Sequence, residues 1–261
     1  MGSVGGASTI ESYCLSLAVC RQWVKALCLY RDINFDQMSQ SHIDFMLSKI
    51  PMGRFGTPDE IAAMRVQLHE SLEAGALGLS TGLAYASAYN ASTDEVKQLT
   101  EELSAFGAVY TTHLRSEFEP VLEAMDEAFS IGRHSQSPVI ISHLKCAGVG
   151  NWGRSPQLLA SLEAAAKTQH VGCDCYPYAA SSSTLDLKQV TDAHRITITW
   201  STPHPEVSGR DLIDIAAEWN VPLPDAAKRL QPAGAVYYGM DEADVRKILA
   251  HPLSMVGSDG L

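Results

Sequence analysis

Two histidines, His113 and His143, have the type and spacing that metal chemistry needs. Each ends a short segment typical of a strand, Tyr110-Thr111-Thr112 before the first and Ile140-Ile141-Ser142 before the second. If these strands are parallel neighbours, their ends lie about 5 Å apart. Two imidazoles at that separation can bind one metal ion, so the spacing favours a metal site over two isolated side chains.

A third strand end supplies a candidate proton acceptor. The segment Met255-Val256-Gly257-Ser258 leads into Asp259, and an aspartate in that place can hold a metal-bound water and take its proton. A single histidine at a strand end more often caps a backbone carbonyl. Two histidines at matching strand ends, together with this aspartate, favour the metal-site interpretation.

The residues that must position these side chains form a repeating helix and strand unit. Capped helices are expected to begin at Thr57-Pro58-Asp59-Glu60 and Ser92-Thr93-Asp94-Glu95, and to end at Gly75 and Gly107. Further helices are expected over residues 120–133 and after Ser155. Strands are expected to start at residues 76, 108, 139 and 171, and steps of 31 or 32 residues are the length of a βα unit in a parallel sheet.

The rest of the chain is less regular. Strands are expected at residues 196–200 and 253–258, and helices at residues 209–220 and 242–250. Six strands fall short of the eight in a closed (β/α)8 barrel, so the spacing predicts an α/β fold on a parallel sheet that is open or closed. We expect this domain to span residues 52–261, whereas residues 1–51 have no clean period and stay unassigned.

Composition excludes several function classes. The sequence has 261 residues, of which 46% are hydrophobic, as expected of a folded domain. Its net charge of -11 would repel nucleic acid and anionic lipid surfaces. The apolar run at residues 14–20 is too short for a membrane span and lacks the basic start of a signal peptide. Six dispersed cysteines indicate a reducing compartment, so we expect a cytoplasmic protein.

Several motifs, in order, make the sequence recognisable. Together they resemble the D-aminoacylases, or N-acyl-D-amino-acid deacylases, of the amidohydrolase superfamily, and the resemblance runs from about Met52 to Leu261. It implies an α/β fold that is a partial TIM-like (β/α)8 barrel of the metal-dependent hydrolase type, incomplete at both ends. The segments that carry it are Gly75 to Tyr85, His113-Leu114-Arg115, Ile141 to Cys146, Asn151-Trp152-Gly153, Cys175-Tyr176-Pro177-Tyr178 and Gly257-Ser258-Asp259-Gly260.

The resemblance also implies an activity and its residues. It implies zinc-dependent hydrolysis of the amide bond of small-molecule N-acyl-D-amino acids to a carboxylate and a D-amino acid. By position, His113 and His143 match the zinc ligands after the fifth and sixth barrel strands, and Asp259 matches the catalytic aspartate after the eighth. Lys145 and Tyr176 match residues that hold the substrate carboxylate. Ser182 lies in a stretch whose family counterpart contacts substrate.

The sequence departs from the family pattern at both ends. The family carries a His-x-His motif on its first barrel strand and a metal-binding cysteine soon after, and neither can be aligned here. The chain ends just after Asp259-Gly260, so we expect a fragment that is incomplete at both ends. Two imidazoles alone should bind zinc weakly, because catalytic zinc takes three protein ligands. Open sheet edges would also favour self-association.

Three alternatives remain. A cyclic-amide hydrolase of the hydantoinase or dihydroorotase type would share the barrel and its strand-end histidines. In such an enzyme a carbamylated lysine at the end of the first expected strand bridges two metals. The sequence there reads Leu79-Ser80-Thr81-Gly82, so that lysine is absent. A non-catalytic fragment is the second. In the third, Cys173 and Cys175, on one face of a strand, bind the metal, although that spacing more often reflects packing.

Overall fold

The computed structural model describes residues 58–85 and 88–259. They form two compact units, each described here by itself. The first unit includes the described residues up to Leu144 together with Gln157–Asp174 and Pro252–Met255. The second includes Lys145–Pro156, Cys175–His251 and the residues from Val256 onward. The expectation for residues 1–51 lies outside the described residues.

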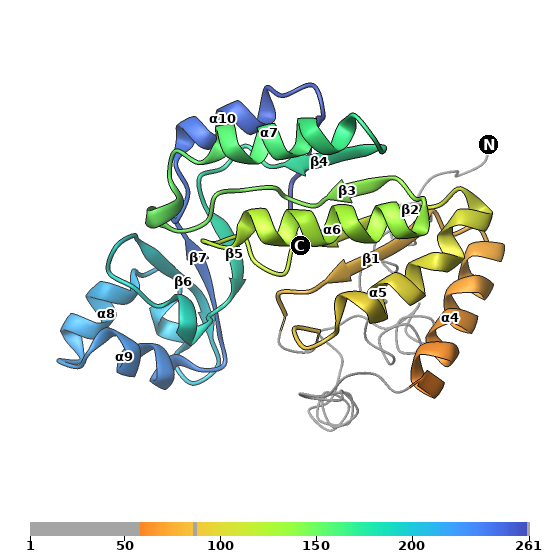
Figure 1. Ribbon diagram of the computed structural model, residues 1–261. Coiled ribbons are helices and arrows are strands. Elements are labelled where there is room, and N and C mark those ends of the chain that lie inside the picture. Colours follow the sequence, from red (N-terminus) through yellow and green to blue (C-terminus); the bar gives the residue numbers. More distant parts are fainter. Residues whose placement is uncertain (1–57, 86–87, 260–261) are drawn as a thin grey trace, which may run out of the picture. The chain divides into compact units, whose positions relative to one another are not determined.

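The first unit is built on a parallel sheet. The pairs β1–β2, β2–β3 and β3–β4 are all parallel, as the regular spacing predicted, and β1 and β8 stand at the two ends of the strand order (Figure 1). The sheet is therefore not closed within the described residues, which agrees with a partial barrel. In sheet order the strands are β1 (Gly78–Gly82), β2 (Val109–His113), β3 (Val139–Ile141), β4 (Val171–Cys175) and β8 (Ser254–Val256).

Four helices follow the predicted positions. The Ser92 hydroxyl accepts a hydrogen bond from the Glu95 N–H at 3.1 Å and so caps α5, while Gly107, with φ 60°, ends the segment. Between them the helix tightens into the 3₁₀ turn η2 (Glu101–Phe106). The helices are α4 (Pro58–Glu73), α5 (Thr93–Thr100), α6 (Val121–Ser135) and α7 (Ser155–Ala166).

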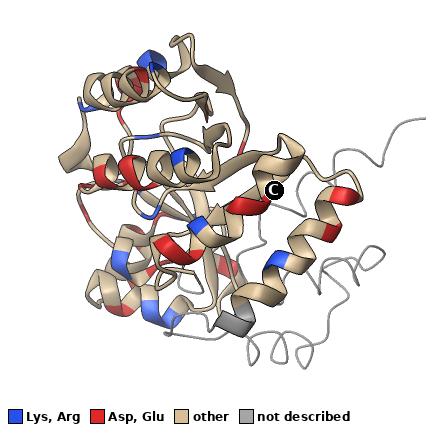
Figure 2. Cartoon of the chain, turned by 45° about the vertical axis from the view of Figure 1, so that its right-hand side comes forward, with Lys and Arg blue, Asp and Glu red and all other residues tan. Residues whose placement is uncertain are grey.

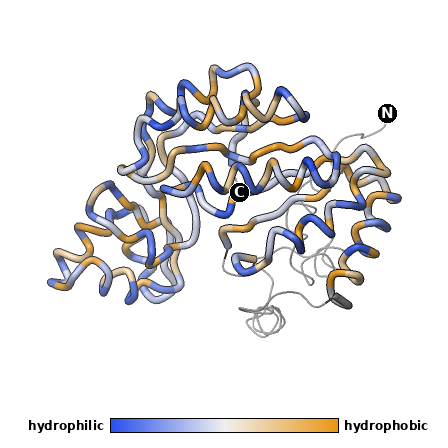
Figure 3. Tube along the Cα trace, in the orientation of Figure 1, coloured by the Kyte–Doolittle hydropathy of each residue, from blue (hydrophilic) through white to orange (hydrophobic). Residues whose placement is uncertain are grey.

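Apolar faces hold the helices against the strands. Met125 and Phe129 of α6 are fully or almost fully buried, as is Val139 of β3. Gly132 lets α6 pack closely against Val139, because a Cβ at residue 132 would lie 2.1 Å from a methyl carbon of Val139. Figure 3 shows hydrophobic and hydrophilic residues alternating along these helices, as one-sided burial requires.

The second unit contains an antiparallel sheet. It is ordered β5 (Ser181–Thr184), β7 (Ala233–Tyr237) and β6 (Ile196–Ser201). The strand expected at residues 196–200 exists, but counting it with the barrel strands was wrong, because it pairs antiparallel to β7. At Gly234 of β7, a Cβ would lie 2.2 Å from the indole nitrogen of Trp200, so only glycine lets that ring pack onto the strand.

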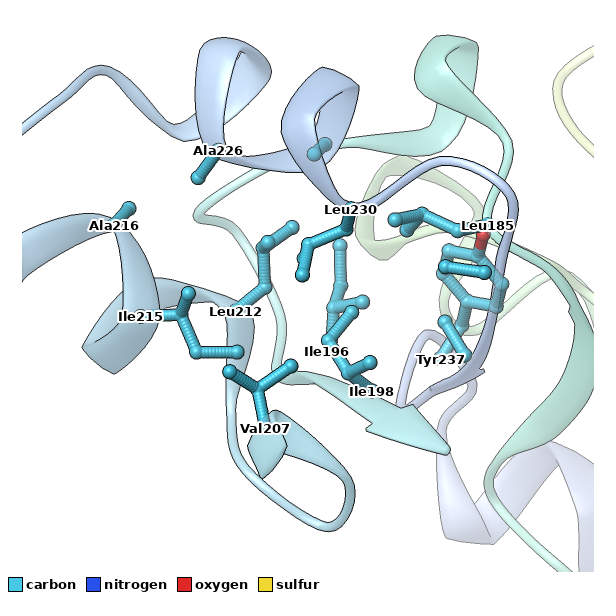
Figure 4. Close-up of a cluster of buried hydrophobic side chains, with 13 residues drawn as sticks. Leu185, Ile196, Ile198, Val207, Leu212, Ile215, Ala216, Ala226, Leu230 and Tyr237 are labelled. Atoms are coloured by element: carbon cyan, nitrogen blue, oxygen red, sulfur yellow. The ribbon is translucent and has the colours of Figure 1, made fainter. Parts of the chain in front are cut away.

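This sheet has its own hydrophobic core. The helices of the unit are α8 (Leu212–Glu218), α9 (Leu223–Leu230) and α10 (Glu242–Leu249), together with the 3₁₀ turns η3 (Val149–Asn151), η4 (Leu187–Gln189) and η5 (Pro205–Val207). Figure 4 shows residues of α8 and α9 directed toward the side chains of the sheet. The buried set includes Ile196, Ile198, Leu212, Ile215, Leu230 and Tyr237.

Charged residues of both signs lie mostly on helices and loops, whereas the strands are largely free of them (Figure 2). None of the helices in the described ranges combines the length and the apolar character that crossing a bilayer requires.

Candidate metal centre

His113 and His143 come together at the carboxyl edge of the parallel sheet. His113 is the last residue of β2, and His143 follows the last residue of β3 by two positions. The His113 Nδ1 atom lies 2.8 Å from His143 Nε2, and the ring centroids are 4.4 Å apart. The predicted proximity of the two imidazoles is confirmed, while their role as metal ligands stays a prediction.

A turn, rather than continued strand, sets the direction of the second imidazole. His143 has the left-handed φ of 42°, which a non-glycine residue seldom adopts. Asp174 of β4 stabilises the turn: its Oδ1 atom accepts from the His143 N–H at 2.7 Å, and its carbonyl accepts from the Leu144 N–H at 2.8 Å. The expected strand through His143 therefore ends at Ile141, and the imidazole is directed toward His113.

Glu117 is a third member of the site and was missed in the sequence analysis. Its Oε1 atom lies 2.8 Å from His143 Nδ1 and 3.9 Å from His113 Nε2. One donor atom from each of the three residues can be chosen so that all lie within 4.8 Å of one another. The signal was a carboxylate four residues after a strand-end histidine, because a ligating histidine commonly donates its other N–H to such a group.

A part-buried ion pair fixes the loop that follows β1. The Arg115 Nε and Nη2 atoms donate to the Glu127 carboxylate at 2.9 and 2.8 Å, and Thr93 donates to it at 2.7 Å. Burial alone would raise the pKa of Glu127, but these hydrogen bonds outweigh it and the pKa is lowered. Arg115 also donates to the carbonyls of Tyr89 and Ala91 in the loop.

The same loop places an aromatic ring beside the metal centre. The ring of Tyr85 lies 4.9 Å from that of His113, centroid to centroid. Gly82, at the end of β1, leaves the room for it, because a Cβ there would lie 2.6 Å from a Tyr85 ring carbon. One side of the His113 imidazole is therefore covered by an aromatic surface.

In the second unit, two of the expected substrate residues are neighbours. The Lys145 Nζ atom lies 5.3 Å from the centre of the Tyr176 ring, and both side chains are buried. Ser182 lies on β5, where its backbone is paired with Val236 and its side chain is exposed. Asp259 follows β8 by three residues, is exposed and has the left-handed φ of 49°. The roles of all four residues stay predictions.

Comparison with known proteins relates the chain to one group of enzymes. It is 48% identical over 208 residues to a D-aminoacylase of Alcaligenes xylosoxydans xylosoxydans, covering 80% of this chain and 43% of the relative. The chain is homologous to the D-aminoacylases. An N-acyl-D-aspartate deacylase of the same organism is also 48% identical, over 80% of this chain and 42% of that enzyme. No protein-family profile matches the chain.

Solved structures of D-aminoacylase type share the fold. A D-aminoacylase crystal structure, described as defining a novel subset of amidohydrolases, superposes with a TM-score of 0.77 at 46% identity and covers 82% of this chain and 45% of that one. The N-acyl-D-glutamate deacylase of Bordetella bronchiseptica, solved with zinc and a phosphonate inhibitor, gives 0.76 at 43% identity, over 79% of this chain and 44% of that one. The chain thus spans less than half the length of the D-aminoacylase relatives it matches.

The three described cysteines, Cys146, Cys173 and Cys175, are buried. Burial raises the pKa of Cys173 to about 11 and that of Cys146 to about 12, which keeps both thiols protonated near neutral pH. Within the described ranges, the group of His113, Glu117 and His143 is the one cluster of three that could hold a metal ion. The packing interpretation of Cys173 and Cys175 is therefore favoured over the metal interpretation.

Proposed function

We propose that this chain carries the zinc-binding strand ends of an enzyme that hydrolyses N-acyl-D-amino acids to a carboxylate and a D-amino acid. The contact between His113 and His143 at the ends of adjacent parallel strands carries the proposal. The homology to D-aminoacylases supplies the reaction class. The substrate is a small molecule that bears a carboxylate.

The donor set fits zinc. Imidazole nitrogens are ordinary zinc ligands, and His113 Nδ1 and His143 Nε2 face each other at 2.8 Å, with the Glu117 carboxylate beside the pair. When bound, zinc would polarise the acyl carbonyl and lower the pKa of water to about 7. The two strands hold the imidazoles in register, because β2 and β3 are hydrogen-bonded neighbours.

The other residues have distinct roles in this proposal. Asp259 accepts the proton from the attacking water and then delivers it to the leaving amine. Lys145 and Tyr176 hold the substrate carboxylate, and the Lys145 ammonium lies 5.3 Å from the centre of the Tyr176 ring. Ser182 contributes a hydroxyl to the substrate. These four roles follow from the positions that the residues share with the family motifs.

The proposal includes the cellular compartment and the partners of the protein. We place the protein in the cytoplasm, in keeping with Cys146, Cys173 and Cys175, which form no disulfide within the described part of the chain. Self-association through the open sheet is expected at β8, where Met255 and Val256 are 51% and 79% exposed. Neither nucleic acid nor membrane is a partner in this reading, because the net charge is -11.

The test is hydrolysis of N-acetyl-D-methionine with added zinc, measured on this chain and on a full-length relative that carries the same motifs. N-acetyl-L-methionine and hydantoin serve as controls for enantiomer and reaction class. Release of D-methionine by the relative, abolished by the equivalent of His143→Ala, is the expected result. Ring opening of hydantoin faster than deacylation would instead favour the cyclic-amide hydrolase. No turnover of any substrate by the relative would contradict the assignment.

A further inference from the structure

We propose that Glu117 is a positioning residue that acts on the metal through His143. This inference rests on the metal centre of the proposed function. The Glu117 Oε1 atom lies 2.8 Å from Nδ1 of His143, while Nε2 of that ring faces His113. Glu117 therefore contacts the side of the imidazole that points away from the other histidine.

The hydrogen bonds select one tautomer. An ionised carboxylate only accepts hydrogen bonds, so the proton of a neutral His143 lies on Nδ1 and is donated to Glu117. The lone pair is left on Nε2, the atom that faces His113 Nδ1 at 2.8 Å. His143 is thereby held with the lone pair of Nε2 directed toward His113 Nδ1, where one metal ion would lie between the two rings.

The same carboxylate is close to the outer nitrogen of the other ring. His113 Nε2 lies 3.9 Å from Glu117 Oε1. If His113 presents the lone pair of Nδ1 to a metal, its proton moves to Nε2, on the side of Glu117, and no proton is lost overall. The inner nitrogens of the two rings therefore face each other, and their outer nitrogens face one carboxylate.

Glu117 is held in place by its neighbours along the chain. Arg115 is anchored to Glu127, and on the other side the Phe118 carbonyl accepts from the Val121 N–H at 3.0 Å, where α6 begins. The Glu117 side chain is only 12% exposed. A carboxylate that is held and largely shielded can fix the orientation of an imidazole, whereas a mobile surface carboxylate cannot.

The decisive experiment measures zinc affinity rather than activity. Wild type, Glu117→Gln and Glu117→Asp are titrated with zinc against a chromophoric chelator. The amide of Glu117→Gln has the size of the carboxylate but accepts more weakly, so we expect zinc affinity to fall by about 10- to 100-fold. Glu117→Asp should recover part of the loss. Glu123→Gln, an exposed change of the same charge on α6, should bind zinc as wild type does.

Cobalt substitution separates positioning from direct ligation. If Glu117 acts through His143, the cobalt absorption bands of Glu117→Gln at saturating metal should match those of wild type. His143→Ala, which removes a ligand, should change them. Circular dichroism checks that each variant is folded.

Three results would overturn the inference. The first is zinc affinity of Glu117→Gln within twofold of wild type. The second is a zinc-bound crystal structure with a Glu117 oxygen at a bonding distance of about 2.1 Å from the metal, which would make it a direct ligand. The third is absence of zinc binding by wild type, which would also remove the metal centre of the proposed function. The first two results would contradict the role of Glu117 but leave the proposed zinc centre intact. A failure of this inference can therefore be told apart from a failure of the proposed function.

Discussion

The guanidinium of Arg115 and the carboxylate of Glu127 form a two-pronged ion pair, with N···O distances of 2.9 and 2.8 Å. The pair joins the turn after His113 to helix α6, and Arg115 extends the connection to the loop after β1. Two side chains thus organise the backbone on one side of the metal centre.

Arg115→Ala should destabilise the first unit. The change leaves the largely buried Glu127 carboxylate without its main partner and two loop carbonyls without their donor. We expect a loss of about 1–3 kcal/mol in the free energy of unfolding, below that of a fully buried pair because both groups retain some exposure. Urea unfolding measures it, with the exposed Arg133→Ala as control. Equal effects of the two substitutions would contradict the assigned role of the pair.

Acid should weaken the fold through Glu127. Its pKa is lowered in the folded protein, so its contribution to stability is present above the ordinary value near 4.5. The contribution is lost as pH falls through the lower folded-state pKa. Unfolding free energies measured from pH 7 down to pH 3 should therefore decline less steeply on the acid side in Glu127→Gln than in wild type. Parallel pH profiles would show that Glu127 does not contribute.

Measuring the zinc content of variants should distinguish the proposed metal ligands, His113 and His143, from the proposed base, Asp259. His113→Ala or His143→Ala should abolish zinc binding, because each removes one of two facing nitrogens. Asp259→Asn should leave zinc content unchanged and remove any hydrolysis, since its proposed work is proton transfer. Stoichiometric zinc that survives loss of both histidines would place the ligands elsewhere.

Asp244 should be among the most sensitive positions of the second unit. Its buried carboxylate accepts from the Gly153 N–H at 2.6 Å, from the Ser155 N–H at 3.3 Å and from the Ser155 hydroxyl at 2.5 Å. Asp244→Ala leaves two buried donors of Ser155 and the part-buried Gly153 N–H without an acceptor, and should cost about 3 kcal/mol. Thermal unfolding checks this against Asp241→Ala, which removes only the exposed cap of α10 and should cost about 1 kcal/mol.

The thiol of Cys146 should react slowly. Its pKa of about 12 leaves very little thiolate at pH 8, and the side chain is buried. A thiol reagent added to the folded protein should therefore label Cys146 far more slowly than it does in urea. Mass spectrometry of the labelled peptide distinguishes Cys146 from the other cysteines, and rapid labelling of the native protein would contradict the assignment.

The parallel sheet could be predicted because its signals are local. The Ser92 cap, the terminating Gly107 and the apolar runs of β2 and β3 each act within a few residues, so their order and direction followed from the sequence. The antiparallel sheet could be predicted only in part. A strand was expected where β6 lies, but β5 is a run of polar residues, and β7 pairs with both strands across long stretches of sequence.

The candidate site also contains residues that could be predicted from the sequence and one that was missed. His113 and His143 could be found because each lies at the end of a recognisable strand. Glu117 was missed, because its place four residues after His113 is a weak signal and an acidic residue in a loop has the sequence character of a solvated surface group. Only the turn at His143, with its left-handed φ, brings that imidazole within reach of the carboxylate.

The packing of Trp200 on Gly234 gives the second unit an optical label of its own. The three described tryptophans, Trp152, Trp200 and Trp219, all belong to that unit. In a Trp23→Phe background, indole fluorescence therefore follows the second unit alone, while the absorption of cobalt bound at the histidines follows the first. The order in which heat or denaturant disrupts each unit can then be measured in a single sample, without attaching a dye.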